Sequence, residues 1–126
     1  DWDEVLNMTG NSGPYIQYTY ARAGSILQKA GENTSLETGT SNDDEMKILR
    51  MICRYPEEVA LAATTYAPQV IANYLFELAQ RFNSFYNRNK VIGGENESFG
   101  LALVGACALI LKNGLELLGI ETVQKM

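Results

Sequence analysis

The sequence predicts an all-α fold, on three observations. Apolar residues between positions 70 and 86 recur at the 3.6-residue spacing of one face of an α-helix. Proline and glycine stand at the boundaries of such stretches, and no alternation typical of a half-buried strand rises above noise. The 126 residues are 46% hydrophobic and 20% charged, which suits one soluble domain with a single core. We therefore expect a single bundle of about five helices.

The first helix is expected to run from Pro14 to about Ala30. A cluster of helix-breaking residues precedes it, in which Asn11 or Ser12 can cap the free N–H groups of the first turn. Proline suits the first helical position because its missing N–H costs nothing there. Residues 31–42, which begin with glycine and are rich in Thr, Ser and Asn, predict a loop.

Two short helices follow this loop. Either Asn42 with Glu45 or Ser41 with Asp44 provides a capping box that starts the second helix. Pro56 is pre-set for the first turn of the third helix, and the two glutamates after it favour the positive end of the helix dipole.

The fourth helix begins at Ala67-Pro68 and is the clearest element of the chain. Its predicted core stripe comprises Val70, Ile71, Tyr74, Leu75, Leu78, Ala79, Phe82, Phe85 and Tyr86. The fifth helix is expected from about Glu97 to Leu118, with Gly119 closing it. Because it is apolar on almost every side, we expect it at the centre of the bundle.

Several features indicate the cellular setting. Cys53 and Cys107 lie in apolar helical patterns, which predicts buried free thiols and a reducing, cytoplasmic location. Residues 99–111 carry no charge, but thirteen residues are too few for a membrane span of about 20. The chain opens without a signal peptide and without an initiator methionine, so we expect a fragment of a larger protein.

The chemistry of catalysis is missing from the sequence. With no histidine and two unrelated cysteines, the chain offers neither the commonest acid–base group nor a zinc site, and no Gly-rich phosphate loop occurs. The carboxylates at 43–45 and 57–58 open predicted helices, where the helix dipole favours acidic residues. We therefore predict no catalytic residue and no metal ligand.

Three segments together closely resemble the C-terminal, all-helical anticodon-binding (DALR) domain of arginyl-tRNA synthetases. They are GNSGPYIQYTYAR at 10–22, NYLFELAQRFNSFYN at 73–87, and LKNGLELLGI at 111–120 with the terminal QKM. The resemblance extends over essentially the whole chain. It implies that residues 1–12 are the exit segment from an absent catalytic domain and that residues 13–126 form the anticodon-binding domain.

The resemblance also implies a function. The parent enzyme would be a class I ligase that joins arginine to its tRNA using ATP with magnesium, although both catalytic signatures of that class are absent here. The implied partners are the anticodon loop of arginine tRNA, read mainly at its central cytosine, and the enzyme's own catalytic domain. DNA and membranes are not implied.

Single-stranded anticodon bases are recognised by stacking on aromatic rings and by hydrogen bonds to base edges. Exposed tyrosines near amides and basic residues are therefore the candidates. At the two helix ends these are Gln17, Tyr18, Arg22, Asn83, Phe85, Tyr86 and Asn87. By resemblance, the leading base contacts are Met126 and Tyr86, supported by Gln17, Ala21 and Arg22.

Some of these residues have structural interpretations that remain open at this point. Tyr86 continues the core stripe but lies near a helix end, so core and contact are both open. Arg22 can contact phosphate or form an ion pair on the helix surface. Tyr15 is expected to pack at the helix entrance, whereas Tyr74 and Phe82 are expected in the core.

Two departures bear on this interpretation. Family members usually carry an arginine just before the Leu-Ala-Leu of the last long helix, where this chain has Gly100, which puts a phosphate or structural contact in doubt. The net charge of −5 is also opposite to that of a typical RNA-binding protein. Residues 1–58 carry the whole acidic excess, so the charge distribution still allows a binding face built from the second half and the first helix.

One or two stacked bases contribute roughly 1–3 kcal/mol each, which predicts a dissociation constant in the millimolar range for the chain alone. A helical protein-interaction module without RNA binding is an alternative, and a contiguous basic and aromatic face would argue against it. The related domain of another class I synthetase, such as the cysteine enzyme, is a second. A small ligand-binding bundle would need a closed apolar cavity.

Overall fold

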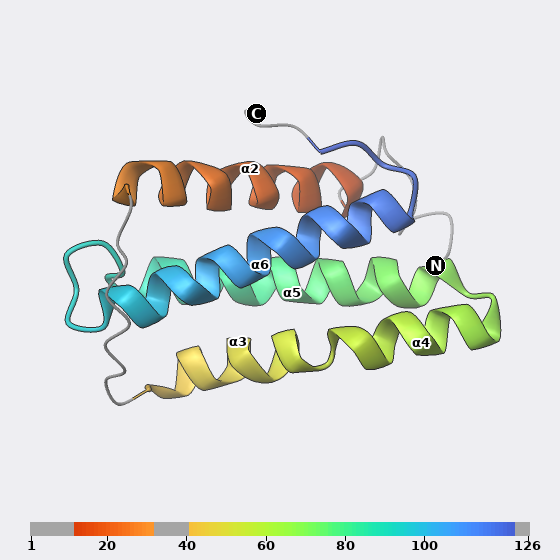
Figure 1. The fold of residues 1–126 in the computed structure, drawn as a ribbon, viewed down its shortest axis with the longest axis horizontal. Coiled ribbons are helices and arrows are strands. Elements are labelled where there is room, and N and C mark those ends of the chain that lie inside the picture. The colour runs from red at the N-terminus through yellow and green to blue at the C-terminus, as the bar shows by residue number, and fades with distance from the viewer. Residues whose placement is uncertain (1–11, 32–40, 123–126) are drawn as a thin grey trace.

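The computed structural model describes residues 12–31 and 41–122, and these residues form an all-α bundle, as predicted (Figure 1). The helices are α2 (Ser12–Ala30), α3 (Asp43–Cys53), α4 (Tyr55–Thr65), α5 (Pro68–Arg88) and α6 (Glu97–Leu117). Only Arg54 separates α3 from α4, so the two helices continue one another along one side of the bundle.

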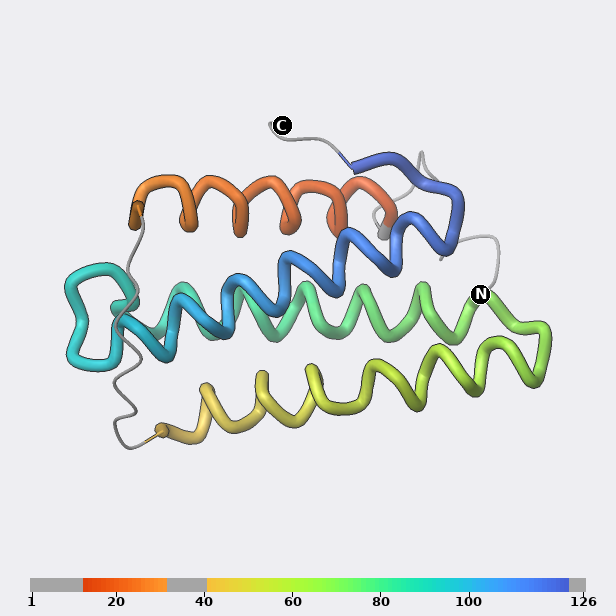
Figure 2. The backbone as a smooth tube through the Cα atoms, in the orientation of Figure 1, coloured from red at the N-terminus to blue at the C-terminus, as the bar shows by residue number. Residues whose placement is uncertain are grey.

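Helix α5 packs against all four other described helices. Figure 2 shows it between α2 on one side and the α3–α4 pair on the other, with α6 across it. Most of its predicted stripe is buried, and Tyr74 and Phe82 are 2% and 0% exposed, which confirms both as core residues. The Tyr74 hydroxyl donates to the Met51 carbonyl at 2.5 Å, so the buried ring also ties α5 to α3.

Helix α6 crosses α5 and packs against α2, α5 and α3. Leu111 and Leu115 on its inner side are fully buried, as expected for a core helix. Its outer side differs from the predicted central position, because Leu109 and Leu117 there are 59% and 58% exposed. By length and composition alone α6 could cross a membrane, and half of its apolar window is buried within the described part of the bundle.

The starts of two helices test the predicted caps. Helix α2 begins at Ser12 rather than Pro14, and the capping role predicted for Asn11 or Ser12 stays a prediction because Asn11 lies outside the described residues. Pro14 still lies in the first turn, where backbone N–H groups lack helical partners. For α3, Asn42 and Glu45 form the predicted capping box, with N–H to side-chain distances of 2.8 and 2.9 Å.

The end of α6 turns the chain back towards α2. Gly119 adopts φ +76°, in the left-handed region that favours glycine. The N–H of Ile120 donates to the Leu115 carbonyl at 2.8 Å, and that of Gly119 to Glu116 at 3.0 Å, which together form a Schellman motif. Figure 1 shows the last described residues, which end at Thr122, returning towards the first half of α2.

The two cysteines differ from each other. Cys107 is a buried free thiol, as predicted, and burial raises the pKa of this thiol to about 12. The prediction for Cys53 was wrong, because this thiol is free but exposed at the last residue of α3. An apolar sequence pattern does not fix which way the final residue of a short helix faces.

At Gly114, α6 packs directly on Leu75 of α5, and we predict that Gly114→Ala lowers the free energy of unfolding. A Cβ there would lie 2.6 Å from both Cδ atoms and 3.0 Å from Cγ of Leu75, which is fully buried. We expect a loss of roughly 1–3 kcal/mol by urea denaturation. Gly105→Ala is the matched control on α6, because its Cβ would meet nothing within 4 Å and should stabilise by about 0.5–1 kcal/mol. Equal effects at both positions would contradict the close approach at Gly114.

We also predict that one thiol per folded chain reacts with Ellman's reagent at pH 8. Cys53 is exposed, whereas Cys107 is buried and stays protonated far above pH 8. Cys53→Ser should abolish the reaction of the folded chain, and addition of guanidinium chloride should release the second thiol. Rapid reaction of two thiols without denaturant would show that the core around Cys107 opens readily.

Candidate nucleic-acid interface

The interface is built where α2 and α5 lie side by side and run in the same direction (Figure 1). Arg22 of α2 reaches across to the last turns of α5. Its Nη1 donates to Asn83 Oδ1 at 2.6 Å, and its Nη2 donates to Asn87 Oδ1 at 2.8 Å. Three predicted site residues thus form one hydrogen-bonded cluster, although Asn83 and Asn87 lie 61 and 65 positions after Arg22 in the sequence.

Tyr86 belongs to the same cluster. The guanidinium carbon of Arg22 lies 5.1 Å from the centroid of its ring, within cation–π range. The ring also stacks on Phe82, with centroids 6.2 Å apart and planes 8° apart. Tyr86 is half-buried, so both predicted roles have a basis: part of the ring packs on the core, and part remains accessible beside Arg22.

Asn83 holds this cluster on the bundle. Its Nδ2 lies 2.9 Å from Thr19 Oγ1 and 3.0 Å from the Tyr15 hydroxyl, while its Oδ1 accepts from Arg22. Thr19 is fully buried and donates to the Tyr15 carbonyl at 2.9 Å. Tyr15 packs edge-on against Phe76 with ring centroids 5.5 Å apart, as expected for a packing residue at the helix entrance. The amide oxygen of Asn83 therefore has a fixed direction.

Tyr18 offers the most open aromatic ring in this region. It is 47% exposed and lies four residues before Arg22, so the two side chains are neighbours on the surface of α2. Thr19 is the residue that sequence reasoning missed, because a threonine within an aromatic run gives no signal that a distant asparagine will reach it.

The structure does not bring every predicted residue to the cluster. Phe85 is 2% exposed and belongs to the core, so its suggested contact was wrong. Gln17 donates instead to the Glu121 carbonyl at 2.9 Å and holds the segment after α6 against α2. Ala21 is 5% exposed, which leaves little surface for a contact, and its role stays a prediction. Met126 lies outside the described residues.

The charge of Arg22 is not neutralised within residues 12–31 and 41–122. The ion pairs found there join other arginines to Glu58, Glu77 and Asp44, and none involves Arg22. Among the described residues, Arg22 therefore does not form the helix-surface ion pair that was the alternative to a phosphate contact. The two bonds to asparagine use two of the five N–H donors of a guanidinium, which leaves donors for an anionic ligand.

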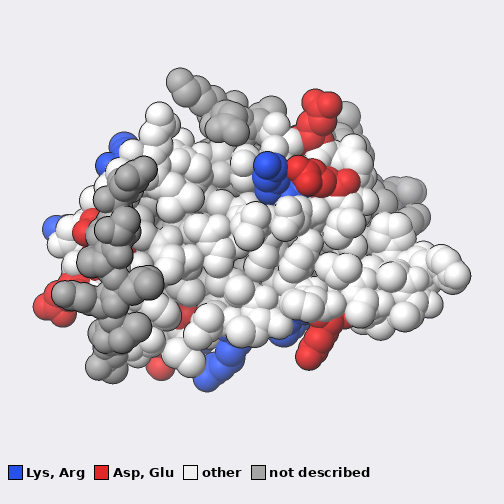
Figure 3. All heavy atoms as spheres, viewed as in Figure 1, with Lys and Arg blue, Asp and Glu red and all other residues white. Residues whose placement is uncertain are grey.

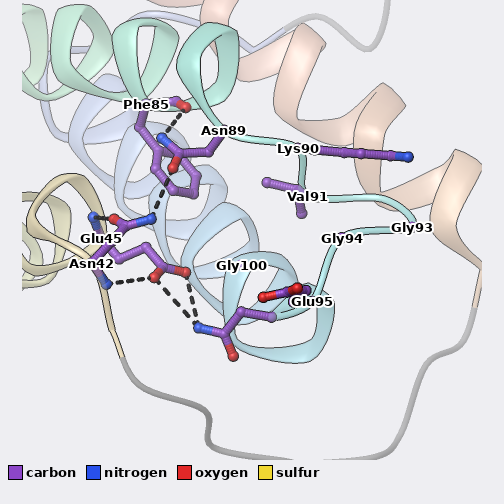
Figure 4. Close-up of a pocket in the computed structure, with 11 residues that line it drawn as sticks. Asn42, Glu45, Phe85, Asn89, Lys90, Val91, Gly93, Gly94, Glu95 and Gly100 are labelled. Atoms are coloured by element: carbon purple, nitrogen blue, oxygen red, sulfur yellow. Dashed lines mark hydrogen bonds between the residues drawn. The ribbon is translucent and has the colours of Figure 1, made fainter.

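Gly100, where the resemblance led us to expect an arginine, is explained by its neighbour. A Cβ at this position would lie 3.0 Å from Val91 Cγ1 and 3.3 Å from Cγ2, so Val91 takes the room that a side chain would need. Both residues line an open depression of about 500 Å³ at the end of the bundle (Figure 4). Glu45, which also lines it, is 5% exposed, and its carboxylate accepts from the Asn42 N–H at 2.9 Å and from Asn96 Nδ2 at 3.1 Å. These polar contacts hold helix ends together.

Known proteins are similar to this chain over its full length. An arginine–tRNA ligase from Clostridium botulinum (strain Alaska E43 / Type E3) is 38% identical over 100% of the chain, and one from Clostridium beijerinckii is 39% identical over 100%. The chain spans 23% of the length of each, about a quarter.

Solved structures give the same result. The Thermus thermophilus arginyl-tRNA synthetase matches with a TM-score of 0.87 and 34% identity, over 98% of this chain and 23% of that one. The Plasmodium falciparum enzyme matches with a TM-score of 0.83 and 30% identity, over 100% and 23% respectively. The model of one family, described as the DALR anticodon binding domain, matches residues 16–126. With that match over most of its length, the chain belongs to the DALR anticodon-binding domain family.

Proposed function

We propose that this chain recognises the anticodon of arginine tRNA as the C-terminal domain of an arginyl-tRNA synthetase. The observation that carries this proposal is Arg22, which two asparagines hold beside the ring of Tyr86 without a carboxylate partner in the described residues. An ordered guanidinium next to an accessible tyrosine offers stacking surface and donors to an unpaired base and its phosphate.

The roles within this cluster differ. Tyr18 and Tyr86 provide stacking surface, while Arg22 and Asn87 provide hydrogen-bonding groups at the surface. Asn83 acts as a positioning residue because it is engaged by Arg22, Thr19 and Tyr15. The central cytosine of the anticodon is the proposed base, with Met126 as a further contact, as the resemblance implies.

The remaining steps of the reaction belong to the parent enzyme. Residues 13–126 would orient the tRNA, residues 1–12 would lead from the catalytic domain, and that domain would join arginine to tRNA using ATP and magnesium. The relatives are named as arginine–tRNA ligases, which supports this assignment. A cytoplasmic location is part of the proposal. The alternative of a protein-interaction module without RNA binding gains no support from these relatives.

The first test is an NMR titration of the 126-residue chain with an arginine anticodon stem–loop, beside a stem–loop whose central cytosine is replaced. We expect millimolar binding, with the largest shifts at Tyr18, Arg22 and Tyr86, and weaker shifts with the control RNA. Tyr86→Ala should remove most of the difference between the two RNAs, because it removes stacking surface and a neighbour of Arg22.

Two results would count against the proposal. Equal shifts with both RNAs would mean that no base is read at this cluster. A sub-micromolar dissociation constant at physiological salt would contradict the expected weak binding, because the few contacts available at this cluster cannot supply that affinity.

A second prediction tests the positioning role of Asn83. Asn83→Ala removes the acceptor for Arg22 and a partner of the buried Thr19, so we expect the free energy of unfolding to fall by roughly 1–3 kcal/mol. Discrimination between the two RNAs should fall as well, because Arg22 loses its fixed orientation. Asn73→Ala is the matched control, since Asn73 lies exposed on the same helix and this change should be neutral or slightly stabilising. Unchanged discrimination in Asn83→Ala would overturn the positioning role.

A further inference from the structure

A second positive feature lies between α3 and α5. Two depressions, of about 360 and 80 Å³, adjoin there and share Lys47 and Arg81 in their linings. We call them together the basic groove, defined by five cations. These are Lys47, Arg50, Arg54, Arg81 and Arg88. Half of the ten Lys and Arg residues of the chain thus gather in one place, although the chain as a whole carries −5.

Nearby acids hold some of these cations in place without neutralising all of them. Arg54 pairs with Glu58 at 2.9 Å, Arg81 with Glu77 at 3.5 Å and Arg88 with Asp44 at 3.7 Å. Lys47 and Arg50 take part in none of the ion pairs found among the described residues, and both are exposed. The groove therefore keeps a local excess of positive charge.

Arg54 is also oriented by its surroundings. Its Nη1 lies 3.3 Å from Met51 Sδ, and its guanidinium carbon lies 5.9 Å from the centroid of the Tyr74 ring. A guanidinium held in this way loses less side-chain entropy when it meets a phosphate.

The hydrogen-bonded cluster of Arg22, Asn83, Tyr86 and Asn87, here called the α2–α5 cluster, lies close to the basic groove. The two features lie on either side of one exposed strip along α5. Successive residues of an α-helix are about 100° apart, so Ser84 and Arg88 lie one step around α5 from Asn83 and Asn87. The side chains of Gln80, Ser84 and Asn87 on this strip are exposed and polar. Because a helix with its side chains is roughly 10–12 Å across, one nucleic-acid stem can touch both edges of the strip.

The view in Figure 3 is consistent with this distribution, because the face it shows is mostly free of Lys and Arg side chains. Its centre lies over α6, on which Leu109 and Leu117 are exposed. One basic patch in this view lies beside acidic side chains near the upper middle of the face, and the other basic side chains in view lie towards its edges.

We propose that the basic groove binds the phosphodiester backbone of the RNA stem whose loop is read at the α2–α5 cluster. This inference rests on the proposed function, since it adds a second contact to the same RNA. The groove would contribute affinity that does not depend on base sequence, while Arg22 and Tyr86 would contribute base discrimination.

The test compares single charge-neutralising variants of the 126-residue chain. Arg50→Gln removes a groove cation with no ion-pair partner in the described residues, and Lys112→Gln, exposed on α6, changes the net charge equally elsewhere. The dissociation constant of the anticodon stem–loop is measured by NMR at 50 and 200 mM salt. Each backbone contact should cost about threefold in affinity over this range.

Raising the salt from 50 to 200 mM should increase the dissociation constant of every variant. We expect this increase to be about threefold smaller for Arg50→Gln than for the unsubstituted chain. For Lys112→Gln we expect the same increase as for the unsubstituted chain. Discrimination at the central cytosine should survive in Arg50→Gln, whereas Tyr86→Ala should lose it. Amide shifts on α3 at Lys47 and Arg50 should accompany RNA binding.

The outcomes separate this inference from the proposed function. Shifts at Arg22 and Tyr86 without shifts on α3 would overturn the groove and leave anticodon reading intact. The same salt response in Arg50→Gln and Lys112→Gln would also overturn it, because only net charge would then matter. No binding at millimolar RNA would overturn the proposed function together with the groove.

Discussion

The burial of α5 is the constraint on which the rest of the structure depends. This helix contacts the four other described helices, and Leu75, Leu78, Ala79 and Phe82 on it are fully buried. Because α5 is held from several sides, its rotation about its own axis is fixed. That rotation decides which side chains reach α2, which reach α3 and which remain in solvent. The α2–α5 cluster and the basic groove are thus two consequences of one packing arrangement.

Much of this arrangement could be predicted from the sequence. The stripe on α5 has strict helical spacing over nearly five turns, so core residues such as Tyr74 and Phe82 follow from periodicity alone. The capping box at Asn42 and Glu45 and the turn at Gly119 follow from local chemistry that operates over a few residues. Cys53 and the start of α2 were predicted wrongly, because patterns are weakest at helix ends, where one residue changes which side faces solvent.

The site was predictable only in part, since sequence spacing says nothing about which distant residues meet. Arg22, Asn83, Tyr86 and Asn87 were named as candidates, but their hydrogen-bonded arrangement depends on α2 and α5 running in the same direction at one register. The basic groove was not anticipated at all. Counting charge along the chain assigns Lys47, Arg50 and Arg54 to an acidic half, whereas the fold places them beside Arg81 and Arg88.

The difference between charge counted along the sequence and charge gathered by the fold answers the objection that an acidic chain should repel RNA. At physiological ionic strength the Debye length is about 8 Å, so a phosphate responds mainly to the charges within that distance. Five of the ten basic residues of the chain line the groove, and ion pairs with acids among the described residues involve three of these five. Net charge governs long-range attraction and the rate of encounter, but backbone contact depends on the local surplus at Lys47 and Arg50, and that surplus is positive.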